Sequence, residues 1–169
     1  KEELNKIGDL IPAYGQVEEL RQIKTAEELE KIKKAIQITI KAFKFIKYFI
    51  SPGKKEIEVA GELERFIRYN GARSSAFDII VASGPNSSFP HHLTSQRKLK
   101  NNEHVLIDLG VEYLGYKSDL TRVFFLGKIK VLVSKVYAIV LKAQEQAIKR
   151  IRPGAEIAVA KRCIPPYLL

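Results

Sequence analysis

The sequence predicts an α+β domain in which an antiparallel hairpin is backed by long helices. Three observations lead to this fold class. Residues 104–125 alternate in polarity along two arms, as strands do. Residues 25–50 and 131–151 carry apolar side chains at helical spacing. The stretch after the first helix, residues 50–60 (ISPGKKEIEVA), recurs one residue shorter at 151–160 (IRPGAEIAVA), so the helical unit is repeated.

The hairpin carries one carboxylate on each arm. The first arm has apolar residues at every second position and His104, Asp108 and Glu112 on the opposite face. The apolar positions are Val105, Ile107, Leu109 and Val111. If the chain reverses at Tyr113 and Leu114, Asp108 lies directly across from Asp119 and both side chains leave the same face of the sheet.

Two carboxylates in that arrangement need a partner. Directly opposed Cβ atoms lie roughly 4.5 to 5.5 Å apart, and two ionised groups about 5 Å apart repel by roughly 3 kcal/mol at an effective dielectric near 20. A shared proton, an arginine such as Arg97 or Arg122, or a bound cation would offset this repulsion. Their hard oxygens suit Mn, Co, Zn or Mg. Spacing alone leaves open that each aspartate only accepts backbone or arginine hydrogen bonds.

Composition predicts one globular domain in the cytoplasm. The 169 residues are 46% hydrophobic, enough for one core. The formal charge of +10 raises the question of nucleic acid. However, the lysines are scattered along helical stretches without an arginine cluster, so we expect a solvated face and no nucleic-acid partner. Cys163 is the single cysteine, which favours a reducing compartment, and no apolar run of membrane-spanning length occurs.

The first helix begins at a capping box, Thr25 with Glu28, and ends before Pro52 and Gly53. Its predicted apolar stripe is Leu29, Ile32, Ile36, Ile40, Phe43, Ile46 and Ile50. A second helix is predicted over residues 56–69, with Ile57, Ala60, Leu63, Phe66 and Ile67 on one side. Residues 77–82 are β-branched and predict a strand.

Residues 83–96 have the Gly, Pro, Asn and Ser content of a loop, and they carry His91 and His92. A loop histidine is usually a surface residue. A pair beside a carboxylate site would instead bind substrate or shuttle a proton.

The third helix, residues 131–151, is followed by the Pro-Gly break of the repeat, after which another helix is expected. The pattern stops near Lys161. We therefore divide the chain into a lead-in at 1–22, a main domain at 23–160 and a divergent tail at 161–169. Because the sequence contains no methionine, we expect a fragment, a processed chain or the product of a broken gene.

Four ordered motifs resemble the Xaa-Pro peptidases, the aminopeptidase P and prolidase group of the pita-bread metallopeptidases. They are residues 20–29 (LRQIKTAEEL), 88–92 (SFPHH), 107–110 (IDLG) and 118–122 (SDLTR). The resemblance covers residues 17–160, and the shared order and spacing make it specific.

This resemblance implies the first half of a pita-bread fold, with a curved antiparallel sheet backed by helices. It implies that residues 23–160 are a partial catalytic domain and that residues 1–22 are a lead-in from a missing amino-terminal domain. It also implies that Asp108 and Asp119 are metal ligands and that His91 lies near the substrate. Members of this family hold two divalent ions, often Mn, Co or Zn, which activate the water that attacks the peptide bond before proline. The implied partner is a peptide with proline at its second position.

The chain departs from the family in one respect. The family takes a histidine and two glutamates from its second half, and no His or Glu follows Glu156. We therefore expect this chain alone to bind metal weakly or not at all and to hydrolyse nothing. A methionine aminopeptidase and a non-catalytic peptide- or protein-binding module remain as alternatives. Apolar surface left open by the missing half would favour a homodimer.

Overall fold

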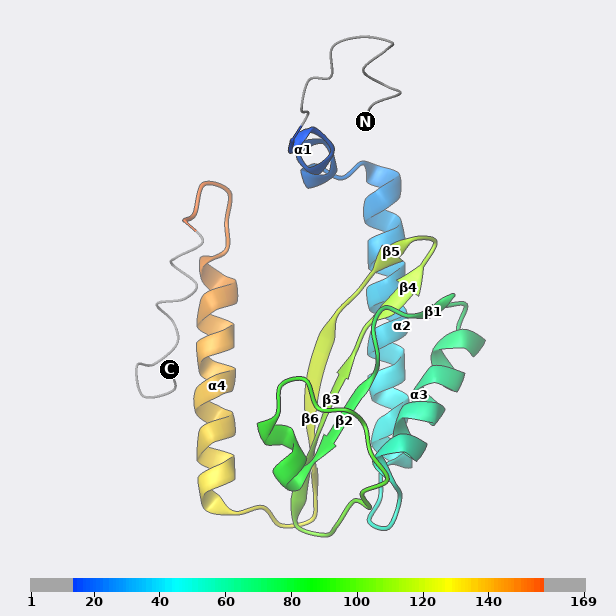
Figure 1. The fold of residues 1–169 in the computed structure, drawn as a ribbon. Coiled ribbons are helices and arrows are strands. Elements are labelled where there is room, and N and C mark those ends of the chain that lie inside the picture. Colours follow the sequence, from blue (N-terminus) through cyan, green and yellow to red (C-terminus); the bar gives the residue numbers. More distant parts are fainter. Residues whose placement is uncertain (1–13, 157–169) are drawn as a thin grey trace, which may run out of the picture.

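The computed structural model describes residues 14–156. The expectations for residues 1–13, for a helix after the second Pro-Gly break and for the tail at 161–169 lie outside the described residues. The described elements run in the order α1 (Gln16–Gln22), α2 (Ala26–Phe49), α3 (Glu56–Tyr69), β1 (Ser74–Ser75), β2 (Ile80–Ser83), η2 (Gly84–Ser88), β3 (Glu103–Leu109), β4 (Val111–Tyr113), β5 (Tyr116–Lys117), β6 (Leu120–Leu126) and α4 (Val131–Arg150). Figure 1 shows α2 and α3 side by side behind the strands, and α4 on the other side of β6.

Helix α2 begins at the predicted capping box. The Thr25 hydroxyl accepts from the Glu28 amide at 3.3 Å, and the Glu28 carboxylate accepts from the Thr25 amide at 2.6 Å. The predicted apolar stripe is partly wrong, because Leu29, Ile36 and Ile40 are exposed. The buried face is Ala35, Ile38, Thr39, Ala42, Phe43 and Ile46. The small residues Ala35, Thr39 and Ala42 let the helix approach the sheet closely. The prediction was based on the spacing of large apolar residues and did not include them.

Helix α3 has the predicted bounds and buries Val59, Leu63 and Ile67. Ile57, which was placed on the apolar side, is instead exposed. Phe66 stacks on Phe45 of α2 with ring centroids 4.4 Å apart, which joins the two helices. The predicted strand at 77–82 is observed as β2, three residues later at its start.

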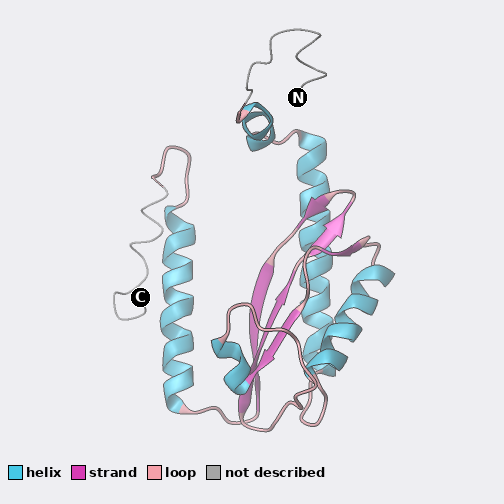
Figure 2. Ribbon diagram, viewed as in Figure 1, coloured by secondary structure: helices cyan, strands magenta, loops and turns pink. Residues whose placement is uncertain are grey.

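The strands form two three-stranded antiparallel sheets, ordered β2-β3-β6 and β1-β4-β5. They share the long hairpin, because β3 continues into β4 and β5 into β6 (Figure 2). The alternation predicted for the first arm is confirmed, because Val105, Ile107, Leu109 and Val111 are all fully buried. These side chains pack with those of α2 and α3 in a single core.

The predicted hairpin register is wrong by two residues. The central turn residues are Leu114 and Gly115, with φ of 49° and 83°, as a tight hairpin turn with two positive φ angles requires. Asp108 therefore pairs with Thr121 and not with Asp119. Because side chains alternate along a strand, a shift of two residues leaves each side chain on the same face of the sheet.

Both arms are interrupted at Gly110, between β3 and β4. Here the amide of Val111 donates to the Ser118 hydroxyl at 3.0 Å. A Cβ atom on Gly110 would lie 2.3 Å from the Ser118 carbonyl oxygen and 2.6 Å from the Phe77 ring. Only glycine fits this close approach of the two arms.

Two helices, α1 and α4, differ from the sequence prediction. The lead-in contains α1, which was not predicted. Helix α4 has close to its predicted bounds but buries none of its residues, and its Tyr137 meets Phe125 of β6 edge-on at 5.2 Å. Among the described residues, no helix combines the length and the apolar character needed to cross a membrane.

Candidate active site

Asp108 and Asp119 lie on the same face of the hairpin. The neighbours of Asp108 in β3, Ile107 and Leu109, are buried in the core, so Asp108 points away from it. Ser118 is also buried and shares a hydrogen bond of 2.7 Å with Thr39 of α2. Asp119, the next residue, therefore faces away from α2 as Asp108 does.

The observed register makes the two aspartates diagonal neighbours. Asp119 precedes by two residues Thr121, the partner of Asp108, and diagonal positions are about 7 to 8 Å apart. The Thr121 hydroxyl donates to Asp108 Oδ1 at 2.6 Å. Asp108 is thus opposite a hydroxyl group and not opposite a second carboxylate. The strong repulsion expected for directly opposed carboxylates is therefore absent from this pair of positions. Sequence analysis gave Thr121 no role.

Neither proposed arginine neutralises this pair. Arg97 makes a two-pronged ion pair with Glu103, at 2.8 and 2.7 Å, and also donates to the Ser83 hydroxyl. Arg122 donates to the carbonyl of its neighbour Thr121 at 2.8 Å. The carboxylates of Asp108 and Asp119 remain as hard oxygen donors on one face.

These two carboxylates fit part of a metal-ligand set. Carboxylate oxygens are suitable ligands for Mn and related divalent ions. Within residues 14–156, no group of three or more His, Cys, Asp or Glu side chains is placed to hold a metal ion. Asp108 and Asp119, the metal ligands predicted from the sequence, therefore do not complete a site by themselves in this part of the chain.

The loop between β2 and β3 carries His91 in a tight turn. The His92 amide donates to the Phe89 carbonyl at 3.1 Å, which places Pro90 and His91 at the centre of the turn. His91 is exposed. Three residues later, the Thr94 hydroxyl donates to the Ile79 carbonyl at 2.8 Å and accepts from the Val81 amide at 2.9 Å.

Thr94 therefore bonds to both neighbours of Ile80, and Ile80 is the residue of β2 that pairs with Asp108. Thr94 therefore ties the loop to β2, next to the position where β2 pairs with Asp108 of β3.

The carboxylate with the most hydrogen bonds, Glu56, was not among the candidates predicted from the sequence. It is the first residue of α3 and is fully buried. Burial alone would raise its pKa, but hydrogen bonds from Ser83, Ser95 and His92 lower the pKa to about 2. An acidic residue in the first turn of a helix is common, so the sequence did not distinguish Glu56 from Glu58.

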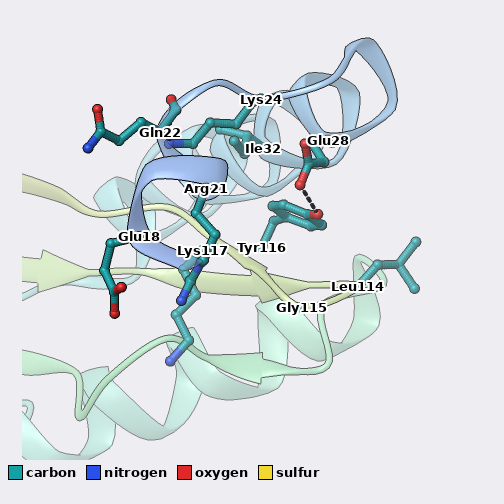
Figure 3. Close-up of a pocket in the computed structure, with 10 residues that line it drawn as sticks. All are labelled: Glu18, Arg21, Gln22, Lys24, Glu28, Ile32, Leu114, Gly115, Tyr116 and Lys117. Carbon is teal, nitrogen blue, oxygen red and sulfur yellow. Dashed lines mark hydrogen bonds between the residues drawn. The ribbon is translucent and has the colours of Figure 1, made fainter. Parts of the chain in front are cut away.

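A separate pocket of about 880 Å³ lies between α1, the start of α2 and the β4–β5 turn (Figure 3). Its charged side chains have both signs, and Tyr116 donates to Glu28 Oε1 at 2.8 Å. The pocket is lined by Glu18, Arg21, Gln22, Lys24, Glu28, Ile32, Leu114, Gly115, Tyr116 and Lys117. It contains none of the candidate site residues Asp108, Asp119 and His91.

Comparison with known proteins identifies the family to which this chain belongs. The sequence of residues 30–164 matches the metallopeptidase family M24, and the chain belongs to that family. A divalent metal is thus a property of the family.

The relatives of this chain include Xaa-Pro dipeptidases and peptidases without a characterised substrate. The chain is 40% identical over 169 residues to the Xaa-Pro dipeptidase of Pyrococcus furiosus, covering 98% of this chain and 47% of that protein. It is 41% identical over 146 residues to an uncharacterised peptidase of Bacillus subtilis, covering 86% and 41%. The chain spans less than half the length of either relative.

Solved structures confirm the predicted fold class. The Xaa-Pro dipeptidase from Bacillus anthracis matches with a TM-score of 0.91 and 42% identity, over 95% of this chain and 45% of that one. The prolidase from Pyrococcus furiosus matches with a TM-score of 0.85 and 39% identity, over 89% and 46%. The helices and antiparallel strands described above are part of a pita-bread fold.

Proposed function

We propose that this chain forms part of a metal-dependent Xaa-Pro dipeptidase, which hydrolyses the peptide bond before a proline at the second position of its substrate. The observation that carries the proposal is the position of Asp108 and Asp119 on one face of the hairpin, in a chain that belongs to family M24. The names of the relatives support the choice of substrate. Residues 23–160 form the catalytic part, and Cys163, the single cysteine, favours a cytoplasmic location.

In this proposal Asp108 and Asp119 are metal ligands. The Thr121 hydroxyl occupies Oδ1 of Asp108 and so orients the carboxylate, leaving Oδ2 for a cation. The Thr39–Ser118 hydroxyl pair fixes the backbone immediately before Asp119. A divalent ion such as Mn, Co or Zn, when bound, lowers the pKa of a water molecule and polarises a carbonyl group.

His91 is proposed to contact the substrate. Its imidazole is exposed on a loop tied to the strand pair of Asp108, and an imidazole can exchange a proton near neutral pH. We propose that the Phe89–His92 turn presents this side chain to the peptide.

We further propose that this polypeptide alone binds metal weakly and hydrolyses nothing. Two carboxylates supply at most four oxygens, whereas each divalent ion takes about four to six ligands. Complete coordination of two ions requires more donors than Asp108 and Asp119.

Calorimetric titration with Mn²⁺ tests the ligand assignment. We expect weak binding by the chain, a further loss of affinity of about tenfold or more in Asp108→Asn because a charged ligand is removed, and no change in the control Glu145→Gln on the exposed face of α4. Tight binding of two ions would contradict the partial site. Equal binding by Asp108→Asn and the native chain would contradict the role of Asp108.

Peptide binding distinguishes the proposed Xaa-Pro peptidase from the two alternative functions. Preference for an Xaa-Pro dipeptide supports the Xaa-Pro peptidase, and the residue 89–92 motif favours this outcome. Preference for a Met-initiated peptide supports a methionine aminopeptidase. Equal binding of both peptides, unchanged in His91→Ala, supports a non-catalytic peptide-binding module.

A homodimer is a further part of the proposal. Helix α4 leaves apolar side chains such as Leu132 and Val140 exposed, at 72% and 51%. Strand β6 is the edge of its sheet. The sequence after α4 repeats the sequence after α2, so α2 and α4 are corresponding helices of the repeat. Helix α2 packs its apolar side against the sheet, whereas the apolar side of α4 is exposed. A second copy of the chain would bury this side of α4.

A further inference from the structure

Glu56 is the only charged side chain that is fully buried among residues 14–156. It does not cap its own helix, because that task belongs to Glu58, whose carboxylate accepts from the Lys55 amide at 2.8 Å. The Glu56 carboxylate instead points out of α3 toward the segment that joins β2 to β3. Its hydrogen-bond partners are all in that segment.

One oxygen of Glu56 holds the start of the segment. Oε1 accepts from the amide and the hydroxyl of Ser83, at 2.8 and 2.6 Å, and from the side-chain amide of Asn86 at 3.0 Å. Ser83 is the last residue of β2, and Asn86 lies in η2.

The other oxygen holds the end of the segment. Oε2 accepts from the amide and the hydroxyl of Ser95, at 3.2 and 2.6 Å, and meets Nε2 of His92 at 2.9 Å. One carboxylate therefore ties together both ends and the middle of residues 83–95. Hydrogen bonds to a charged group are worth more than neutral ones, and here several converge in a buried place.

The bond to His92 acts directly on the turn that carries His91. His92 is the last residue of this turn, and its amide already closes it onto Phe89. An ionised carboxylate can only accept, so it requires the proton of the His92 imidazole to be on Nε2. The turn that carries His91 is therefore tied to α3 through the side chain of His92.

The same network continues into the sheet. The Ser83 hydroxyl donates to Glu56 and accepts from Arg97, and Arg97 pairs with Glu103 of β3. Gly84, with φ of 51°, leaves room for this ion pair, since a Cβ atom there would lie 2.5 Å from Glu103 Oε2. The loop is held between α3 and β3 by polar contacts at each end.

We propose that Glu56 is a positioning residue of the active site: by fixing the Nε2–H tautomer of His92 and both ends of residues 83–95, it holds His91 in the orientation that meets the substrate. This inference rests on the proposed function for the role of His91. The network itself, and the tautomer that it requires, do not depend on catalysis.

The test compares Glu56→Gln with Val59→Ala in the full chain. Glu56→Gln keeps the size of the side chain but replaces one acceptor by a donor, whereas Val59→Ala removes core packing from the same helix and leaves every donor to Glu56 in place. The imidazole nitrogen shifts of His92 and His91 are measured by NMR above neutral pH, with amide hydrogen exchange over residues 84–95. Affinity for an Xaa-Pro dipeptide is measured on the same samples.

In the native chain we expect His92 to be protonated at Nε2. In Glu56→Gln we expect this preference to be lost, and exchange in residues 84–95 to rise about tenfold or more, as the loss of a charged hydrogen bond implies. In Val59→Ala the tautomer stays unchanged. Peptide affinity should fall by the same factor in Glu56→Gln, in His91→Ala and in the double variant, because two residues that act through one contact are not additive.

Several outcomes would overturn the inference. An unchanged His92 tautomer in Glu56→Gln would do so, as would equal loosening of the loop in Val59→Ala, or additive losses of affinity in the double variant. If Glu56→Gln does not fold, Ser95→Ala removes one donor to Oε2 and should raise amide exchange at the end of the loop, in residues 92–95. Unchanged exchange there would contradict the inference. If the native chain binds no Xaa-Pro dipeptide, the proposed function fails, while the tautomer and exchange results still decide the role of Glu56.

Discussion

Single residues in this chain acquire their roles from what surrounds them. Asp108 is stabilised by the hydroxyl group of Thr121, its partner across the strands, and not by an arginine or an opposed carboxylate. Glu56 is buried yet ionised, because hydrogen bonds from Ser83, Ser95 and His92 more than offset the cost of removing it from water. Both carboxylates depend on neighbours that are distant in sequence.

The depressed pKa of Glu56 predicts how stability depends on pH. A carboxyl group whose pKa falls from 4.5 to about 2 on folding stabilises the native state above pH 4.5 and loses that contribution as the pH falls toward 2. A shift of this size corresponds to about 3 kcal/mol. Urea unfolding followed from pH 7 to pH 3 should show a shallower loss of stability in Glu56→Gln than in the native chain. Parallel curves for the two proteins would contradict the assignment.

At the level of elements, the hairpin depends on a close approach of its two arms at Gly110. There the Ser118 side chain, and not its carbonyl group, accepts the Val111 amide, and the Ser118 amide donates to the Val111 carbonyl at 3.0 Å. This local break separates β5 from β6 and sets the backbone of Asp119, while the buried Thr39 hydroxyl ties Ser118 to α2. The break is therefore a feature of the candidate site.

Gly110→Ala should destabilise the chain by about 1 to 3 kcal/mol, because the added Cβ meets the Ser118 carbonyl and the Phe77 ring. Gly61→Ala is the matched control, since a Cβ atom on Gly61 in α3 meets nothing within 4 Å and alanine is the better helix former by about 1 kcal/mol. Chemical unfolding monitored by circular dichroism measures both. A loss in Gly61→Ala equal to that in Gly110→Ala would refute the steric explanation.

At the level of the whole molecule, the two long helices make unequal use of their apolar faces. Helix α2 buries six side chains against the sheet, and α4 buries none. The chain also carries a formal charge of +10, which opposes association between copies. Exposed apolar residues of α4 and electrostatic repulsion therefore act in opposite directions.

The proposed homodimer predicts self-association that increases with salt, since salt screens the repulsion but leaves apolar contacts in place. Light scattering at about 0.05 and 0.5 M salt measures this dependence. The double variant Leu132→Gln and Val140→Gln should shift the chain toward monomer, whereas Ala138→Gln, on the opposite side of α4, should not. A monomer at high concentration and high salt would refute the homodimer.

Local patterns were sufficient for the elements and for the family. The Thr25–Glu28 capping box located the start of α2, the bounds of α3 were predicted correctly, and strict alternation identified the buried face of β3. The four motifs identified the family that residues 30–164 match. The capping box, the helix bounds and the alternation each depend on residues within a few positions of one another, so sequence periodicity and spacing report them directly. The family was identified from the resemblance of the four motifs and their order along the chain.

Sequence patterns were sufficient to predict α2, α3 and α4 and the polarity of the hairpin arms, and the family resemblance added Asp108, Asp119 and His91 as candidate site residues. Three features could be seen only in the folded chain: the register that pairs Asp108 with Thr121, the burial of Ala35 and Thr39 in place of Ile36 and Ile40, and the convergence of residues 83–95 on Glu56. The physical reason is that register and burial depend on turn geometry and on the shape of the opposing surface. Neither is encoded in the spacing of residues along one element.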